Sequence, residues 1–217
     1  MQMIPSVKIC CISSIDEAKL AIHYGASALG LVGHMPSGPG VISDELIFDI
    51  ARYCPPPIAT FLLTSHTKTD DIILHYQRVQ TSTIQIVDAL TQGEYLDIRK
   101  AIPNIKLVQV IHVIDESSIN ECFKIEGQVD AILLDSGNPN LQVKELGGTG
   151  RVHNWKLSRR IVESISVPVF LAGGLKPENV RQAIDEVGSF GLDLCSSVRT
   201  NGILDERKLE LFFKAMG

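Results

Sequence analysis

Two short apolar runs of this sequence carry side chains that can take up or release a proton. Val7–Ile12 contains Lys8 and Cys10, and a second run ends at Asp135. A thiolate can act as a general base and a neutral carboxylic acid as a general acid, so Cys10 and Asp135 could serve one reaction if they faced one pocket. Lys8 stands two residues before Cys10, so on a strand it shares the thiol's face and supplies a cation. The alternatives are structural: core packing for Cys10, a loop cap for Asp135 and a buried ion pair for Lys8.

The elements that would position these groups alternate regularly. Eight strand-like apolar runs alternate with eight amphipathic stretches, and the helical period is clearest over 180–187 and 209–216. Eight such units without a break in composition predict one α/β domain over residues 1–217, a (β/α)8 TIM barrel whose parallel sheet closes on itself, in preference to an open doubly wound sheet. The strand-like runs are Val7–Ile12, Ala28–Val32, Ile58–Leu63, Thr83–Val87, Lys106–His112, Val129–Asp135, Val167–Ala172 and Gly191–Cys195.

Sequence signals also predict where helices begin. Ser14 with Glu17 fits a capping box, and Ser43 precedes two acidic residues. Pro177 is expected near the first helical position of its unit.

Small and polar residues collect in the segments that follow the predicted strands. Gly173-Gly174 follows the seventh strand, Ser196-Ser197 follows the eighth, and Gly147–Gly150 lies in a long segment after the sixth. Loops after strands seven and eight are the recurrent phosphate site of such barrels, because glycine backbone N–H groups approach an anion closely. A phosphorylated small molecule is therefore the expected ligand. The alternative is that the glycines only turn the chain and the serines cap a helix.

Composition narrows the classes of partner. The formal net charge is −5, and the 20 Lys and Arg residues form no block, which argues against nucleic acid or an anionic membrane. The sequence shows neither a signal-peptide pattern nor the roughly 20 apolar residues of a membrane span, so a cytoplasmic protein is expected. Five cysteines without a paired CxxC spacing or a histidine cluster predict reduced thiols and no metal site.

The ordered set of motifs resembles the phosphoribosylanthranilate isomerase family. The resemblance implies an eight-stranded barrel that isomerises N-(5-phosphoribosyl)anthranilate to 1-(2-carboxyphenylamino)-1-deoxyribulose 5-phosphate in tryptophan biosynthesis, without a metal or an organic cofactor. The motifs that carry it are Lys8-Ile9-Cys10, Asp135, Gly147-Gly148-Thr149-Gly150 with Asn154-Trp155, Leu171–Leu175 with Pro177–Val180, and Asp193–Ser197.

The resemblance also implies roles for individual residues. Cys10 would be the general base and Asp135 the general acid of an Amadori rearrangement. Lys8, His34 and Gln85 are the candidate substrate-binding residues, with a satisfied interior amide as the alternative for Gln85. The candidate phosphate-binding residues are Gly148, Gly173, Gly174, Ser196 and Ser197.

The chain also departs from the family pattern. Cys11 stands where the family has Gly, and it is expected to alternate to the opposite face of its strand from Cys10. The segment Ser37–Gly40 lacks the Arg that binds the anthranilate carboxylate in the family, which leaves His34 as the nearest candidate cation. Ser197 replaces a Gly and Arg199 a Glu; the serine could still donate to phosphate, and Arg199 could add positive charge to the site. The departures predict weakened or altered recognition of the anthranilate half.

Three functions remain open from the sequence. The first is the isomerase itself, and the second is a paralogue that performs the same chemistry on another N-substituted phosphoribosylamine. The third is a noncatalytic barrel that binds a sugar phosphate. Retention of both Cys10 and Asp135 favours an enzyme, and the sequence does not define the oligomeric state.

Overall fold

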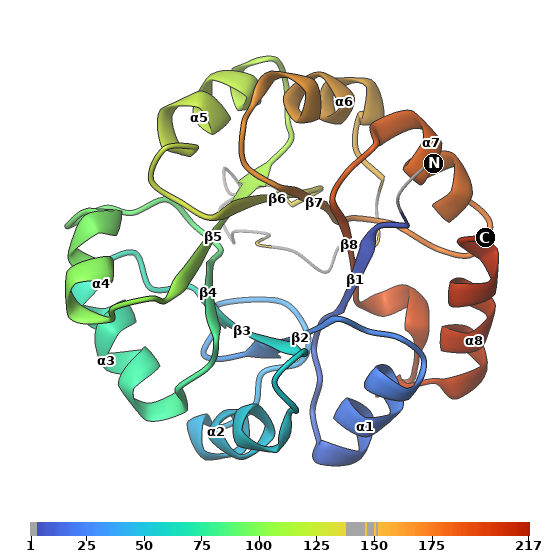
Figure 1. The fold of residues 1–217 in the computed structure, drawn as a ribbon, viewed down its shortest axis with the longest axis horizontal. Helices are drawn as coiled ribbons and strands as arrows, with labels where there is room; N and C mark the ends of the chain where they lie inside the picture. The colour runs from blue at the N-terminus through green and yellow to red at the C-terminus, as the bar shows by residue number, and fades with distance from the viewer. Residues whose placement is uncertain (1–3, 138–145, 147–149, 151) are drawn as a thin grey trace.

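The chain folds into a closed barrel of parallel strands in the order β1 to β8, seen in a computed structural model that describes residues 4–137, 146, 150 and 152–217. The strands form an inner ring and the helices an outer ring (Figure 1). The strands are β1 Ser6–Ile9, β2 Ala28–Val32, β3 Ala59–Thr64, β4 Thr83–Ile86, β5 Lys106–His112, β6 Ala131–Asp135, β7 Val169–Leu171 and β8 Gly191–Leu194. The helices are α1 Ile15–His23, α2 Asp44–Tyr53, α3 Thr69–Val79, α4 Tyr95–Ala101, α5 Ser117–Ile125, α6 Trp155–Ser164, α7 Val180–Val187 and α8 Glu206–Ala215.

The barrel prediction is confirmed, and the open sheet is excluded because the first strand pairs with the last. β1 and β8 are parallel, with Ser6 opposite Gly191 and Ile9 opposite Leu194. Each observed strand lies within or beside the run predicted for it. The carboxyl ends of the strands therefore meet at one rim, where barrel active sites lie.

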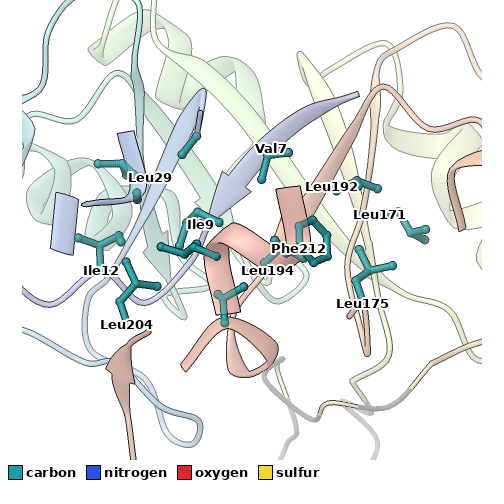
Figure 2. Packing of buried hydrophobic residues seen from close by; sticks show 14 of the residues in the cluster. Val7, Ile9, Ile12, Leu29, Leu171, Leu175, Leu192, Leu194, Leu204 and Phe212 are labelled. Atoms are coloured by element: carbon teal, nitrogen blue, oxygen red, sulfur yellow. The ribbon is translucent and has the colours of Figure 1, made fainter. Parts of the chain in front are cut away.

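Side-chain alternation along β1 separates two apolar layers. Val7 and Ile9 belong to the layer between the strands and the helices, whereas Cys10 belongs to the cluster inside the barrel. Lys8, two residues from Cys10, is fully buried, and its ammonium lies over the ring of Phe61 inside the barrel. The outer layer is shown in Figure 2 and includes Val7, Ile9, Leu171, Leu192, Leu194 and Phe212.

The predicted helix starts are partly confirmed. The Ser14 and Ser43 hydroxyls cap α1 and α2 by accepting hydrogen bonds from backbone N–H groups. The capping box at Ser14 is wrong, because the Glu17 carboxylate accepts from the N–H of Ser13 and also pairs with Arg199. The helix signal at Pro177 is early, since it lies in a turn before α7.

A short hairpin that the sequence did not predict connects β8 to α8. It consists of β9 Arg199–Thr200 and β10 Ile203–Leu204, which pair antiparallel. The hairpin follows a single 3-10 turn, η1 Ser196–Val198. Within the described part of the chain, no helix is long and apolar enough to cross a membrane.

Candidate active site

A pocket at the carboxyl ends of the strands brings most of the predicted site residues together. Its empty volume is about 790 Å³, including the open mouth. Side chains from β1, β4 and β6 and the loops after β2, β7 and β8 form its wall. The predicted residues that line it are Cys10, Gln85, Asp135, Gly173, Gly174, Ser196 and Ser197.

Two of the other predicted residues are not on this wall, and a third is not described. Lys8 lies beneath it, fully buried. His34 is exposed and is not among the residues that line the pocket. Gly148 lies outside the described residues.

The end of β1 places the Cys10 thiol at the floor of the pocket. The Cys10 N–H donates to the carbonyl of Leu194 at 2.7 Å, which extends the β1–β8 ladder by one residue. On the opposite side lies Gly30 of β2, where an added Cβ would come within 2.9 Å of the Cys10 Sγ and 3.1 Å of the Lys8 Nζ. The absence of a side chain at Gly30 makes room for both groups.

Lys8 forms a buried ion pair with Asp193 beneath Cys10. The ammonium lies 2.8 Å from the Asp193 carboxylate, and both side chains are almost completely buried. Burial alone would lower the pKa of Lys8, but Asp193 and then Cys10 raise it above its ordinary value. Lys8 therefore carries a positive charge beneath Cys10.

Cys11 does not alternate to the opposite face, so that expectation is wrong. Its φ of 62° lies in the left-handed region, which turns its side chain toward the pocket instead of the outer layer. A Cβ on Gly40 would lie 2.5 Å from the Cys11 Cβ, so the loop after β2 packs directly on Cys11. Strand alternation ends here because it requires extended backbone.

Arg199, which the sequence suggested could add positive charge to the phosphate site, pairs with Glu17 and does not line the pocket. Its guanidinium is buried and pairs with both carboxylate oxygens of Glu17, at 2.9 and 3.1 Å. It also donates to the carbonyls of Cys10 at 3.1 Å and Cys11 at 2.6 Å. Arg199 therefore binds the end of the strand that carries the candidate base, and it satisfies carbonyls that the left-handed turn removes from the sheet.

Gln85 and Asp135 face the pocket from the side opposite β1. Gln85 is 3% exposed, and its carbonyl oxygen has no hydrogen-bond partner among the described residues, which leaves a buried acceptor for a ligand hydroxyl or amine. Asp135 ends β6 and is 5% exposed. Its carboxyl group lines the pocket and can therefore reach a bound ligand.

His153 is a candidate functional residue that the sequence analysis did not identify. Its Nε2 is 2.7 Å from the Ser158 hydroxyl, and its Nδ1 is buried with no partner in the described part of the chain. Burial lowers the pKa of His153 to about 4, against an opposing effect of the nearby Asp135. The imidazole beside Asp135 is therefore neutral at physiological pH. No local motif marks it, because its significance comes from Asp135, 18 residues away in the sequence.

The loops after β7 and β8 meet on one side of the pocket. Gly173 and Gly174 have φ values of 85° and 62°, which other residues rarely adopt. Ser196 and Ser197 begin the 3-10 turn η1 opposite them. Backbone N–H groups from two such loops can surround a phosphate.

Comparisons with known proteins agree with this geometry. The family model described as N-(5'phosphoribosyl)anthranilate (PRA) isomerase matches residues 7–215. N-(5'-phosphoribosyl)anthranilate isomerase 2 of Methanosarcina mazei is 37% identical over 205 residues, which cover 94% of this chain and 90% of that protein. The corresponding isomerase of Methanosarcina acetivorans is 33% identical over 221 residues, covering 96% and 91%.

Solved structures show the same architecture. The phosphoribosyl anthranilate isomerase of Thermotoga maritima superposes with a TM-score of 0.80 at 28% identity, over 98% of both chains. A phosphoribosyl anthranilate isomerase in complex with reduced 1-(o-carboxyphenylamino)-1-deoxyribulose 5-phosphate gives a TM-score of 0.77 at 26% identity, again over 98% of both. The family match across nearly the whole chain shows that this protein belongs to the phosphoribosylanthranilate isomerase family.

Proposed function

We propose that this protein is a phosphoribosylanthranilate isomerase of tryptophan biosynthesis in which Cys10 is the general base and Asp135 the general acid. The observation that carries the assignment of roles is that one pocket is lined by both side chains and by the glycine and serine loops after β7 and β8. A noncatalytic sugar-phosphate protein would have no use for a thiol and a carboxyl group across a pocket.

The chemistry requires two proton transfers at different positions of the sugar. Asp135 donates a proton to the ring oxygen, the bond from that oxygen to C1' breaks, and the nitrogen lone pair forms an iminium ion. The Cys10 thiolate then removes the C2' proton, and the electrons of the C–H bond form an enolamine that tautomerises to the ketose. The buried Lys8 ammonium, two residues from Cys10 on the same face of the strand, supplies a positive charge near the base.

Phosphate binding in this proposal rests on backbone donors. Gly173, Gly174, Ser196 and Ser197 would hold the phosphate through N–H groups, and the unpaired oxygen of Gln85 would accept from a sugar hydroxyl or the amine. Inorganic sulfate tests this site: we expect it to inhibit competitively and to occupy the space between the two loops in a crystal. We also propose a cytoplasmic location, consistent with five free cysteines.

The described part of the pocket wall offers no obvious partner for the amine substituent of the substrate. Among the described residues that line it, none is a lysine, an arginine or a histidine. The carboxylate of anthranilate therefore meets no cation from this part of the chain. This observation keeps a second candidate, the same rearrangement on a different N-substituted phosphoribosylamine.

A direct assay separates these functions. We expect freshly prepared N-(5'-phosphoribosyl)anthranilate to lose its fluorescence with the wild-type protein and not with Cys10→Ser or Asp135→Asn. Cys54→Ser is the matched control, because this half-buried thiol ends α2 away from the pocket. Turnover by either site variant near the wild-type rate would refute the roles assigned here. Inactive wild-type protein that still binds sulfate would favour the second candidate.

A further inference from the structure

Two cysteines that the proposed reaction does not use lie in contact at the end of the β1–β8 pair. The Sγ atoms of Cys11 and Cys195 are 2.8 Å apart, whereas the Cys10 Sγ is 3.9 Å from that of Cys11. The backbone brings them together, because β1 and β8 are paired up to Ile9 and Leu194. The contact thus joins two residues that are 184 positions apart in sequence.

The left-handed backbone of Cys11 is what creates this contact. An extended backbone would direct its side chain to the outer layer, away from β8. Instead the thiol lies below the loop after β2, with its Sγ 3.6 Å from the Pro39 carbonyl. Gly40, packed on its Cβ, leaves it little room to move away from Cys195.

The two thiols differ in their readiness to react. The hydrogen bond from Cys11 lowers the pKa of Cys195, against burial, and the Arg199 guanidinium acts in the same direction. Hydrogen bonding to Cys10 and Cys195, together with burial, raises the pKa of Cys11. Cys195 is only partly buried and faces the pocket, so a small reagent can reach it. A thiolate is the form that attacks a disulfide.

We infer that Cys11 and Cys195 are a reversible disulfide site, oxidised by small-molecule disulfides such as glutathione disulfide, while Cys10 remains a thiol. The Cys195 thiolate attacks one sulfur of the reagent and releases the first reduced thiol. The Cys11 sulfur, after losing its proton, attacks the Cys195 sulfur of the mixed disulfide and releases the second. Two electrons pass to the reagent, and the two thiol protons end on the released thiols. The inference does not depend on the isomerase reaction.

Peptide mapping tests this inference. The full-length protein is equilibrated with glutathione disulfide, quenched with acid, alkylated with N-ethylmaleimide and digested with trypsin. We expect peptide 9–19 to be linked to peptide 182–199, with one maleimide on Cys10, and dithiothreitol to reverse the link. Alkylation of both Cys11 and Cys195 throughout the titration would overturn the inference, as would a link through Cys10.

Matched variants identify the sulfurs involved. Cys195→Ser and Cys11→Gly should each abolish the link, whereas Cys10→Ser and Cys122→Ser should retain it. Cys122 is fully buried in α5 and has no contact with the pocket. Two variants on opposite sides of the bond are used so that a folding defect in one does not decide the result. A link that survives in a folded Cys195→Ser protein would refute the assignment.

Discussion

Replacing Arg199 by Met should destabilise this barrel far more than replacing any exposed arginine. The guanidinium makes contacts with both oxygens of Glu17 and with the carbonyls of Cys10, Cys11 and Gly202. Arg199→Met leaves the Glu17 carboxylate buried with only two backbone N–H donors, from Ser13 and Leu204. Breaking a buried ion pair from one side typically costs about 3–5 kcal/mol of unfolding free energy. That is a large share of the roughly 5–15 kcal/mol that stabilises a typical domain.

Urea unfolding at pH 7 measures this loss, with Arg159→Met as the matched control. Arg159 pairs with Glu163 one helical turn away, and both side chains are about half exposed. An exposed pair of this kind contributes about 0.3–0.5 kcal/mol. If Arg199→Met costs no more than Arg159→Met, the buried ion pair does not hold the end of β1 and the reasoning is refuted.

A double-mutant cycle and a pH series separate the ion pair from the packing of the arginine chain. Arg199→Met with Glu17→Gln should cost less than the sum of the single changes, with a coupling of about 1–3 kcal/mol. Burial alone would raise the pKa of Glu17, but the hydrogen bonds from Arg199, Leu204 and Ser13 lower it below its ordinary value. The contribution of the pair is therefore complete above the unfolded value and is lost as pH falls through the folded one. Glu17→Gln should remove this acid dependence.

Three further changes test other parts of the site. Cys11→Gly removes the strain of a left-handed non-glycine residue, a gain of about 1–2 kcal/mol in unfolding free energy. Loss of the buried thiol offsets this gain, so the net change should be less than about 1 kcal/mol. Gln80→Gly, at φ 50° on the surface, should show the gain in stability without the loss of a buried side chain. The His153 imidazole should titrate near pH 4 by NMR. Because the unfolded ring takes up a proton near pH 6.5, the contribution of the neutral buried ring to the unfolding free energy is complete above about pH 6.5 and is lost as pH falls toward 4. A measured pKa near 6.5 would show that the ring is not buried. Pro39→Arg should raise kcat/KM for the anthranilate substrate roughly 10- to 150-fold, since a charged hydrogen bond contributes about 1.5–3 kcal/mol. Gly40→Arg should not raise kcat/KM, because the added Cβ would clash with Cys11. Equal gains from both variants would refute the packing of Gly40 on Cys11.

The barrel could be predicted from the sequence because every unit repeats the same local pattern. In β1, the two-residue period correctly placed Lys8 and Cys10 on one face and Val7 and Ile9 on the other. The same rule failed one residue later, at Cys11, because the chain leaves the extended region there. The rule carries no information about where a strand ends in a left-handed turn.

The contacts that the sequence did not reveal are those between distant residues. Arg199 and Glu17 are 182 residues apart, and neither belongs to a motif that pairs them. Charge alone suggested that Arg199 could add positive charge to the phosphate site, whereas in the structure its guanidinium is buried against the Glu17 carboxylate. Likewise, the effect of Asp135 on His153 joins two residues that are 18 positions apart in the sequence.

The departures at Cys11 and in the loop after β2 form one structural change. The side chain at Cys11 fills the space beneath Gly40 and lies against the carbonyl of Pro39. A glycine at position 11 would leave that space empty and free the loop to approach β1 more closely. The loop after β2, which lacks the arginine of the family, is therefore also the loop that packs on the Cys11 thiol. Asp135, Gly173 and Gly174, on the other side of the pocket, match the family motifs. Two departures from the family pattern, at Cys11 and in the loop after β2, are therefore packed against each other at the pocket.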